Sequence, residues 1–169
     1  MSRNARSRGT PIHDHYGAAF LETHRDRMAG RVLRVDGQGE SQLPQASGGE
    51  RYDCLVCRGA LEAAVDPGEV VARIAGLLVD GGTALVPLAG MGVPVPDAAR
   101  VWSFTPASAR RLFEASFERV EVVSFGNVRT AVAAVQGLAA EELPAGSLEK
   151  HDPDYPVVIG VRADRGARA

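Results

Sequence analysis

A strand, a capped helix and a second strand follow one another directly in the middle of the chain, and this unit constrains the fold most. The apolar runs "YDCLVC" (52–57) and "TALVPL" (83–88) are typical of buried strands. Between them, "DPGEVVARIAGLLV" (66–79) opens with Asp66 as N-cap and Pro67 at the first helical position. Two strands joined through a helix lie parallel in one sheet, so this unit predicts an α/β protein.

The rest of the chain continues the same alternation. Thr105 before Pro106 predicts the start of one helix, Asn127 predicts the cap of another, and Gly30 is expected to end the first helix. We expect further strands at 31–35, 119–125 and 155–163, further helices at 11–29, 104–117 and 128–143, and a long loop at 36–51. The whole pattern predicts a layered fold with a largely parallel sheet.

Length and composition fit one soluble domain. The chain has 169 residues, of which 45% are hydrophobic and 24% charged, and its formal net charge is −2. We expect a single domain over 10–165, with a disordered basic tail at 1–9 and a short tail at 166–169. The balanced charge favours neither a nucleic-acid nor a membrane partner, and "MSRNARSRG" lacks the apolar core of a signal peptide. The expectation is a cytoplasmic protein.

The two cysteines stand three positions apart, as Cys54 and Cys57. This spacing occurs in redox and metal sites. Here both residues lie in a predicted strand, where side chains three positions apart point to opposite faces. We therefore interpret them as buried strand residues and predict no metal at this pair.

The order of the elements resembles that of class I S-adenosylmethionine-dependent methyltransferases of the small-molecule type. The family's "hh-L-K-P-G-G" motif corresponds to the residues before the strand at Thr83, where this chain has "DGG". Its "W-x-F-T-x-x-x-x-R-x-L" motif corresponds to "WSFTPASARRL", which opens the helix at Thr105. The resemblance covers residues 10–165 and implies a Rossmann-like sheet flanked by helices.

The cofactor motif departs from the family pattern. The family's first strand ends in an acidic residue followed by G-x-G-x-G, where glycines let backbone N–H groups approach the cofactor. The acidic position corresponds here to Arg34 and the first glycine to Asp36, while Gly37 and Gly39 are out of phase. We interpret Asp36, Gly37 and Gly39 as a vestigial cofactor site.

The next part of the family fold has no room in this chain. A strand–helix–strand unit takes about 30 residues, but only residues 40–51 separate Gly39 from Tyr52. The family's second and third strands, and the acid that binds the cofactor ribose, are therefore expected to be missing. The family order 3-2-1-4-5-7-6 becomes a truncated sheet of about five strands in the order 1-4-5-7-6.

In that order residues 31–35 form an edge strand with unpaired backbone groups, which is an aggregation liability unless covered or paired. Arg31 and Arg34 are the charges with which edges are commonly protected. The alternative, which we favour, is a homodimer that pairs this strand with its copy.

Candidate site residues come from three segments. In "HDHYG", His13 and His15 are candidate acid–base groups and Tyr16 a candidate substrate contact, since the resemblance places this helix over the active site. A metal held by the two histidines and Asp14 is a weaker alternative. After the strand at 52–57 come Arg58, a candidate partner for an anionic substrate, and Glu62, a candidate base; both also fit an ordinary solvated loop. Trp102 is a candidate wall of the substrate site, or simply a packing residue.

Three functions remain open from the sequence. The favoured one is an enzyme of this fold that no longer binds S-adenosylmethionine and carries out proton transfer, cyclisation or isomerisation on a small metabolite without a cofactor. The second is a methyltransferase that still uses S-adenosylmethionine, and the third a non-catalytic partner of another enzyme. The alanine-, arginine- and valine-rich composition is typical of high-GC bacteria and is compatible with specialised (natural product) metabolism.

Overall fold

The computed structural model describes residues 5–36, 43–45, 49–91 and 101–166. Its centre is one five-stranded sheet in the order β1-β2-β3-β5-β4. The strands are β1 (Val32–Asp36), β2 (Tyr52–Arg58), β3 (Leu78–Ala89), β4 (Arg119–Phe125) and β5 (Val158–Asp164). Translated into family numbering by sequence position, this is the predicted order 1-4-5-7-6.

The sheet is mostly but not wholly parallel. β1 pairs with β2, and β2 with β3, in parallel, whereas β5 runs antiparallel to both β3 and β4. The carboxyl ends of β1, β2, β3 and β4 therefore meet at one edge of the sheet, where β5 begins. We call this the carboxyl edge. Among the described strands only β2 pairs with β1, which makes β1 an outer strand as expected.

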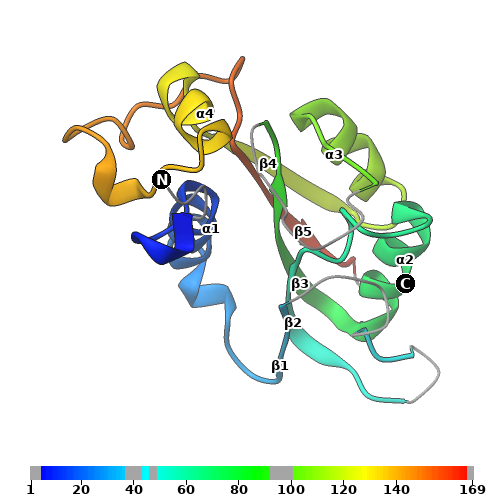
Figure 1. Cartoon of the computed structure of the whole chain (residues 1–169). Coiled ribbons are helices and arrows are strands. Elements are labelled where there is room, and N and C mark those ends of the chain that lie inside the picture. Colours follow the sequence, from blue (N-terminus) through cyan, green and yellow to red (C-terminus); the bar gives the residue numbers. More distant parts are fainter. Residues whose placement is uncertain (1–4, 37–42, 46–48, 92–100, 167–169) are drawn as a thin grey trace.

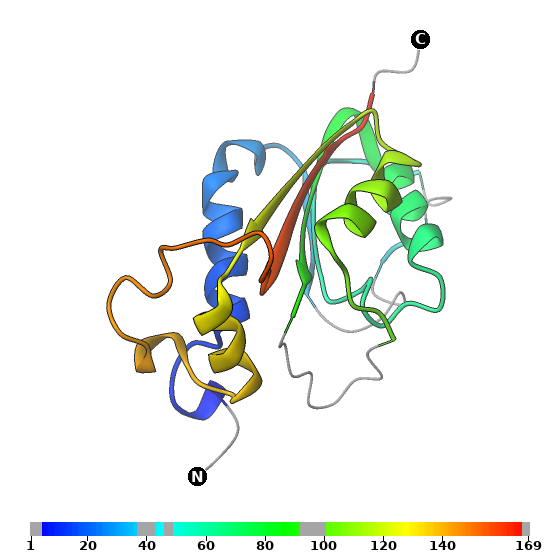
Figure 2. The same cartoon turned by 90° about the horizontal axis from the view of Figure 1, so that it is seen from above.

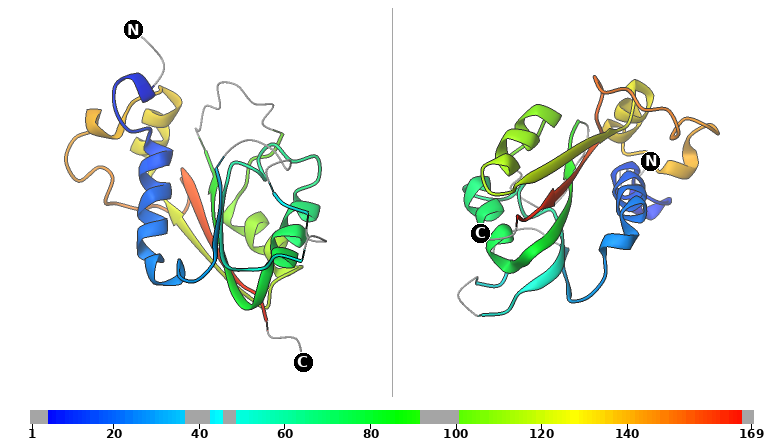
Figure 3. Two further views of the ribbon diagram at one scale, coloured as in Figure 1. Left: turned by 90° about the horizontal axis from the view of Figure 1, so that it is seen from below. Right: turned by 180° about the vertical axis from the view of Figure 1, so that it is seen from behind.

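Helices cover both faces of the sheet. α1 (Ile12–Thr23) and α4 (Val128–Val135) lie on one face, and α2 (Pro67–Leu77) and α3 (Pro106–Glu114) lie on the other (Figures 1 and 2). The views from below and behind show the same three layers (Figure 3). The main core lies between the sheet and α2 and α3, and α1 is seated by Phe20, whose ring lies over Gly160 of β5.

The predicted caps form as expected. The Asp66 carboxylate accepts hydrogen bonds from the N–H groups of Gly68 and Glu69 at the start of α2. Thr105 and Asn127 each form a reciprocal capping box, with Ser108 and Thr130 respectively. These local bonds satisfy N–H groups that the first helical turn leaves without partners.

Several boundaries differ from the sequence expectation. The predicted helix at 11–29 stops at Thr23 and is followed by a separate 3-10 turn, Arg25–Arg27, so Gly30 is not its terminating residue. Gly30 has a positive φ of 72° and lies against the Asp53 carboxylate, which accepts the Arg31 N–H. The predicted helix at 128–143 stops at Val135, because Gly137, the residue after the C-cap Gln136, takes a φ of 71°.

Two strands also differ in length from the prediction. β3 starts at Leu78, immediately after α2, and includes the "DGG" residues that were expected to form a turn. The last strand starts at Val158, three residues later than expected.

The segment expected to be a disordered tail is folded where it is described. Residues 1–4 lie outside the described part of the chain, but Ala5–Ser7 form a 3-10 turn. Arg8 then donates to the Glu142 carboxylate at 3.1 Å, and Pro11 forms a β-bridge with Ala139. Within the described residues, no helix combines the length and apolarity needed to cross a membrane.

Candidate functional site

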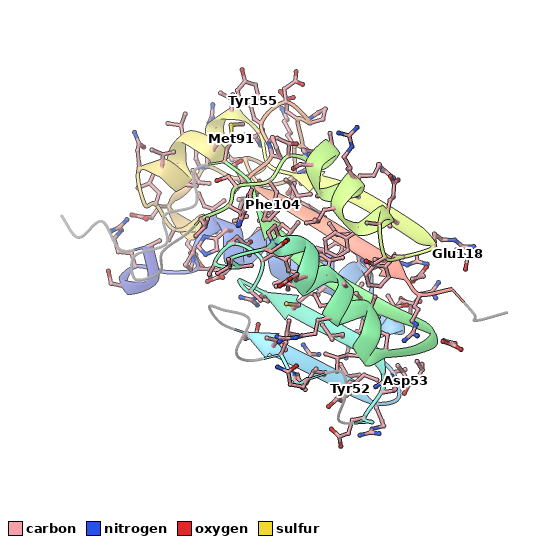
Figure 4. The ribbon with its side chains drawn as sticks, turned by 90° about the vertical axis from the view of Figure 1, so that its right-hand side faces the viewer. Tyr52, Asp53, Met91, Phe104, Glu118 and Tyr155 are labelled. Carbon is pink, nitrogen blue, oxygen red and sulfur yellow. The ribbon has the colours of Figure 1, made fainter. Side chains whose placement is uncertain are left out.

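The carboxyl edge brings together most of the predicted site residues. Ligands of open α/β sheets bind outside the carboxyl ends of the strands. In Figure 4 this end of the molecule is marked by the labelled residue Met91, which follows β3, and by Phe104 and Tyr155. Tyr52 and Asp53, which begin β2, lie at the opposite end of the sheet (Figure 4).

A network of ion pairs centred on Arg58 joins three elements at this edge. The Arg58 Nε atom lies 3.2 Å from Asp36 Oδ1, at the end of β1. Its Nη2 atom lies 3.2 Å from Asp14 Oδ1, in the first turn of α1. His13 Nε2 lies 3.5 Å from the same Asp14 oxygen. Arg58 was predicted to bind an anionic substrate, but in this structure its guanidinium lies between two of the protein's own carboxylates.

Glu62 is mostly inside the protein rather than on a solvated loop. The residue is 7% exposed, and its Oε1 atom accepts the Ala89 N–H at 2.7 Å, at the end of β3. Its main-chain oxygen accepts the N–H groups of Val101 and Trp102. The expectation of a solvated side chain is therefore wrong for Glu62, because its carboxylate is buried and accepts a backbone N–H.

Trp102 stands at the surface beside this glutamate. It is 39% exposed, and its indole Nε1 donates to the Ala64 carbonyl at 2.9 Å. The ring is thus both tethered and partly open to solvent, which fits the predicted role as a wall better than a role in the core.

Tyr16 was predicted to contact substrate, but the structure places it in the core between α1 and α4. Its side chain is fully buried among apolar residues such as Ile12 and Val158. Burial raises the pKa of its hydroxyl, and the nearby Thr130 hydroxyl lowers it in part. Tyr16 therefore serves as a core residue, because solvent does not reach it.

Two histidines flank the Tyr16 ring. His15 lies with its ring centre 5.5 Å away and His151 with its centre 5.8 Å away, both edge-on. His151 was not singled out from the sequence. Its Nδ1 accepts the Gly126 N–H at 3.3 Å, directly after β4, so the neutral ring carries its proton on Nε2. The available signal was its position shortly before the last strand, which begins at the carboxyl edge.

The cysteines behave as predicted. Both are buried, with Cys57 in the core under α2 and α3 and Cys54 in the core under α1. Burial raises the pKa of Cys54 to about 11. Burial, assisted by the negative charge of Glu62, raises the pKa of Cys57 to about 12. Neither thiol is a nucleophile at neutral pH.

The vestigial cofactor residues are only partly described. Asp36 ends β1 and is held by Arg58, whereas Gly37 and Gly39 lie outside the described residues. No described strand lies on the outer side of β1. The described residues thus contain no counterpart of the ribose-binding acid that the resemblance would place there. Within the same residues, no group of three His, Cys, Asp or Glu side chains is arranged to hold a metal ion.

Solved structures share this architecture. A S-adenosylmethionine-dependent methyltransferase from Thermotoga maritima, described as a possible histamine N-methyltransferase, superposes with a TM-score of 0.57 at 11% identity, over 91% of each chain. The SpnF cyclase, which is described as a 4+2 cyclase, superposes with a TM-score of 0.53 at 14% identity, over 92% of this chain and 82% of the other. No family sequence model and no curated protein sequence matches the chain. The chain has the class I methyltransferase fold, a Rossmann-like α/β fold.

Proposed function

We propose that this chain is an enzyme of the methyltransferase fold that acts on a small metabolite without S-adenosylmethionine. The reaction would be of the proton-transfer, cyclisation or isomerisation type, in bacterial specialised metabolism. The observation that carries the proposal is the pair of ion pairs made by Arg58. Arg58 ends β2 and binds Asp36, which ends β1, and Asp14 of α1. This is where the resemblance places the methyl donor.

The neighbouring features support the same proposal. The described residues offer no acid for the cofactor ribose, and a charged hydrogen bond of that kind contributes about 1.5–3 kcal/mol. The described residues therefore lack this contact to S-adenosylmethionine, which supports the proposal. The similarity to a protein described as a cyclase supports a non-methylating reaction as one that this fold can host.

Within this proposal, the acid–base groups are His13 and His15 at the start of α1. His13 is held beside Asp14 at 3.5 Å, which orients its ring at the carboxyl edge. Imidazole is the side chain best suited to exchange a proton near neutral pH. We add His151 to these candidates, because its fixed tautomer presents an N–H donor.

The decisive experiment is isothermal titration of the purified protein with S-adenosylmethionine and with S-adenosylhomocysteine, beside a thermal-shift assay. The proposal expects no binding up to millimolar cofactor. Micromolar binding of either compound would overturn it and restore the methyltransferase alternative.

A thermal-shift screen of small metabolites then separates an enzyme from a non-catalytic partner. We expect a stabilising ligand whose effect is lost in His13→Asn and Trp102→Ala. Arg111→Ala, an exposed change on α3, is the matched control and should keep the effect. A protein stabilised by no metabolite, but by another protein of the same organism, would favour the partner alternative.

We also propose that β1 pairs with its copy in a homodimer. This is supported by the lack of a described strand on its outer side, where backbone groups would otherwise stay unpaired. Arg34 is exposed on this strand, with its guanidinium directed to the Met28 sulfur at 3.4 Å. Light scattering coupled to size-exclusion chromatography should give twice the chain mass of 17.8 kDa, and a monomer mass would contradict the dimer.

A further inference from the structure

Glu62 ties together two segments that are distant in the sequence. Its carboxylate holds the end of β3 through the Ala89 N–H at 2.7 Å. Its main-chain oxygen holds Val101 and Trp102 through their N–H groups, at 2.8 and 3.1 Å. One buried residue therefore bonds both to the end of β3 and to the residues that precede α3.

Trp102 receives its position from this arrangement. Three hydrogen bonds join Val101 and Trp102 to the 62–64 turn: the two backbone bonds to Glu62 and the indole bond to the Ala64 carbonyl at 2.9 Å. Phe104, two residues later, enters the core, and Thr105 then caps α3. The Trp102 backbone and its indole N–H are thus both held by the 62–64 turn, while 39% of the residue stays exposed.

We propose that Glu62 is a positioning residue that sets Trp102 as a rigid wall at the carboxyl edge, against which a flat apolar part of the substrate packs. This rests on the proposed function, since it assumes a small-molecule site at that edge. An aromatic side chain held in one orientation binds a planar apolar group well, because little side-chain freedom is lost on binding. In this role Glu62 acts through the 62–64 turn and Trp102.

The hydrogen bond to Ala89 explains why this position needs an acceptor. A glutamine keeps an Oε1 acceptor for the Ala89 N–H, whereas an alanine leaves that partly buried N–H without this acceptor, which is costly. The main-chain acceptors of Trp102 remain in E62A, so the proposal expects Trp102 to move because the 62–64 turn loses its side-chain bond to the end of β3. The two substitutions therefore separate hydrogen bonding from charge.

Trp102 is the only tryptophan in the chain, so intrinsic fluorescence reports on it directly. We would measure the emission maximum and acrylamide quenching of the folded wild type, E62Q and E62A at 25 °C. We expect E62A to lower the ratio of docked to displaced Trp102 by about tenfold, the equivalent of about 1.4 kcal/mol. The Trp102 fluorescence should then be quenched more strongly by acrylamide, and its emission maximum should shift to the red. E62Q should match the wild type.

The matched control is Glu118→Ala, which removes a glutamate at the opposite end of the sheet (Figure 4) and should leave Trp102 fluorescence unchanged. Unchanged quenching in folded E62A would overturn the proposal, as would an E62Q protein that resembles E62A. If E62A does not fold, E62D withdraws the carboxylate by one methylene: stronger quenching then supports the proposal and unchanged quenching refutes it. No ligand is needed, so this outcome is independent of the cofactor titration.

Discussion

The Arg58 network allows a quantitative prediction, because its two ion pairs have equal lengths but different exposure. Arg58 is 3.2 Å from both Asp14 and Asp36, while the Asp14 side chain is 23% exposed and that of Asp36 is 61% exposed. Solvent screens an exposed pair strongly, and such pairs contribute about 0.2–1 kcal/mol. We expect a coupling of about 1 kcal/mol between Arg58 and Asp14, and of about 0.3 kcal/mol between Arg58 and Asp36.

Double-mutant cycles measure these couplings. Arg58→Gln is combined with Asp14→Asn in one cycle and with Asp36→Asn in the other, and the free energy of unfolding is obtained from urea denaturation. The weak pairing of His13 with Asp14 is lost in both the single and the double variant, so it cancels. Raising the salt concentration should reduce the Asp36 coupling more than the Asp14 coupling, because exposed pairs are screened more strongly.

The result that would refute this reasoning is an Asp36 coupling equal to or larger than that of Asp14. Such a result would mean that Asp36 and Arg58 are more shielded from water than the structure shows.

Three further predictions follow from the structure. Gly160→Ala should destabilise the protein by about 1–3 kcal/mol, because the new Cβ would lie 2.3 Å from the buried Phe20 ring; an unchanged urea midpoint would show that α1 is not seated there. Cys54 and Cys57, with pKa values of about 11 and 12, should not react with a thiol reagent at pH 8 until urea unfolds the protein, and rapid labelling of the native state would contradict their burial. Burial disfavours the charged form of Asp164, but hydrogen bonds from Arg162 and Thr83 outweigh it and lower its pKa. Its carboxylate therefore stabilises the fold above the unfolded value of about 3.9 and loses this effect as the pH falls below it. Asp164→Asn should cost about 2 kcal/mol at pH 7 and much less near pH 2; a cost independent of pH would contradict the assignment.

Most of the sheet could be predicted from local patterns. Runs such as "YDCLVC" and "TALVPL" are apolar enough to be buried whichever neighbours they find. Helix starts were equally readable, because Asp66, Thr105 and Asn127 bond to N–H groups only two or three residues away. Helix ends were harder to predict. The α4 helix stops before Gly137, yet the sequence pattern after this glycine also favoured a helix.

The candidate site was likewise only partly predictable from the sequence. Sequence position alone sufficed to place Arg58 and Glu62 near the end of a strand, at the edge where ligands of this architecture bind. It did not reveal that Arg58 is occupied by Asp14 and Asp36, which are 44 and 22 positions away, or that Tyr16 turns into the core. Those outcomes depend on where α1 lies over the sheet.

The amino-acid sequence by itself determined the strands, the helix caps and the opposite faces of the two cysteines, because these depend on bonds and periodicities within a few residues. Only the tertiary structure decided which charges meet. Glu62 is the clearest case: a glutamate in a turn is expected to be solvated, yet this one is buried and its carboxylate accepts the Ala89 N–H at the end of β3. Such pairings join residues far apart in the chain, so they are set by the packing of whole elements and not by local sequence.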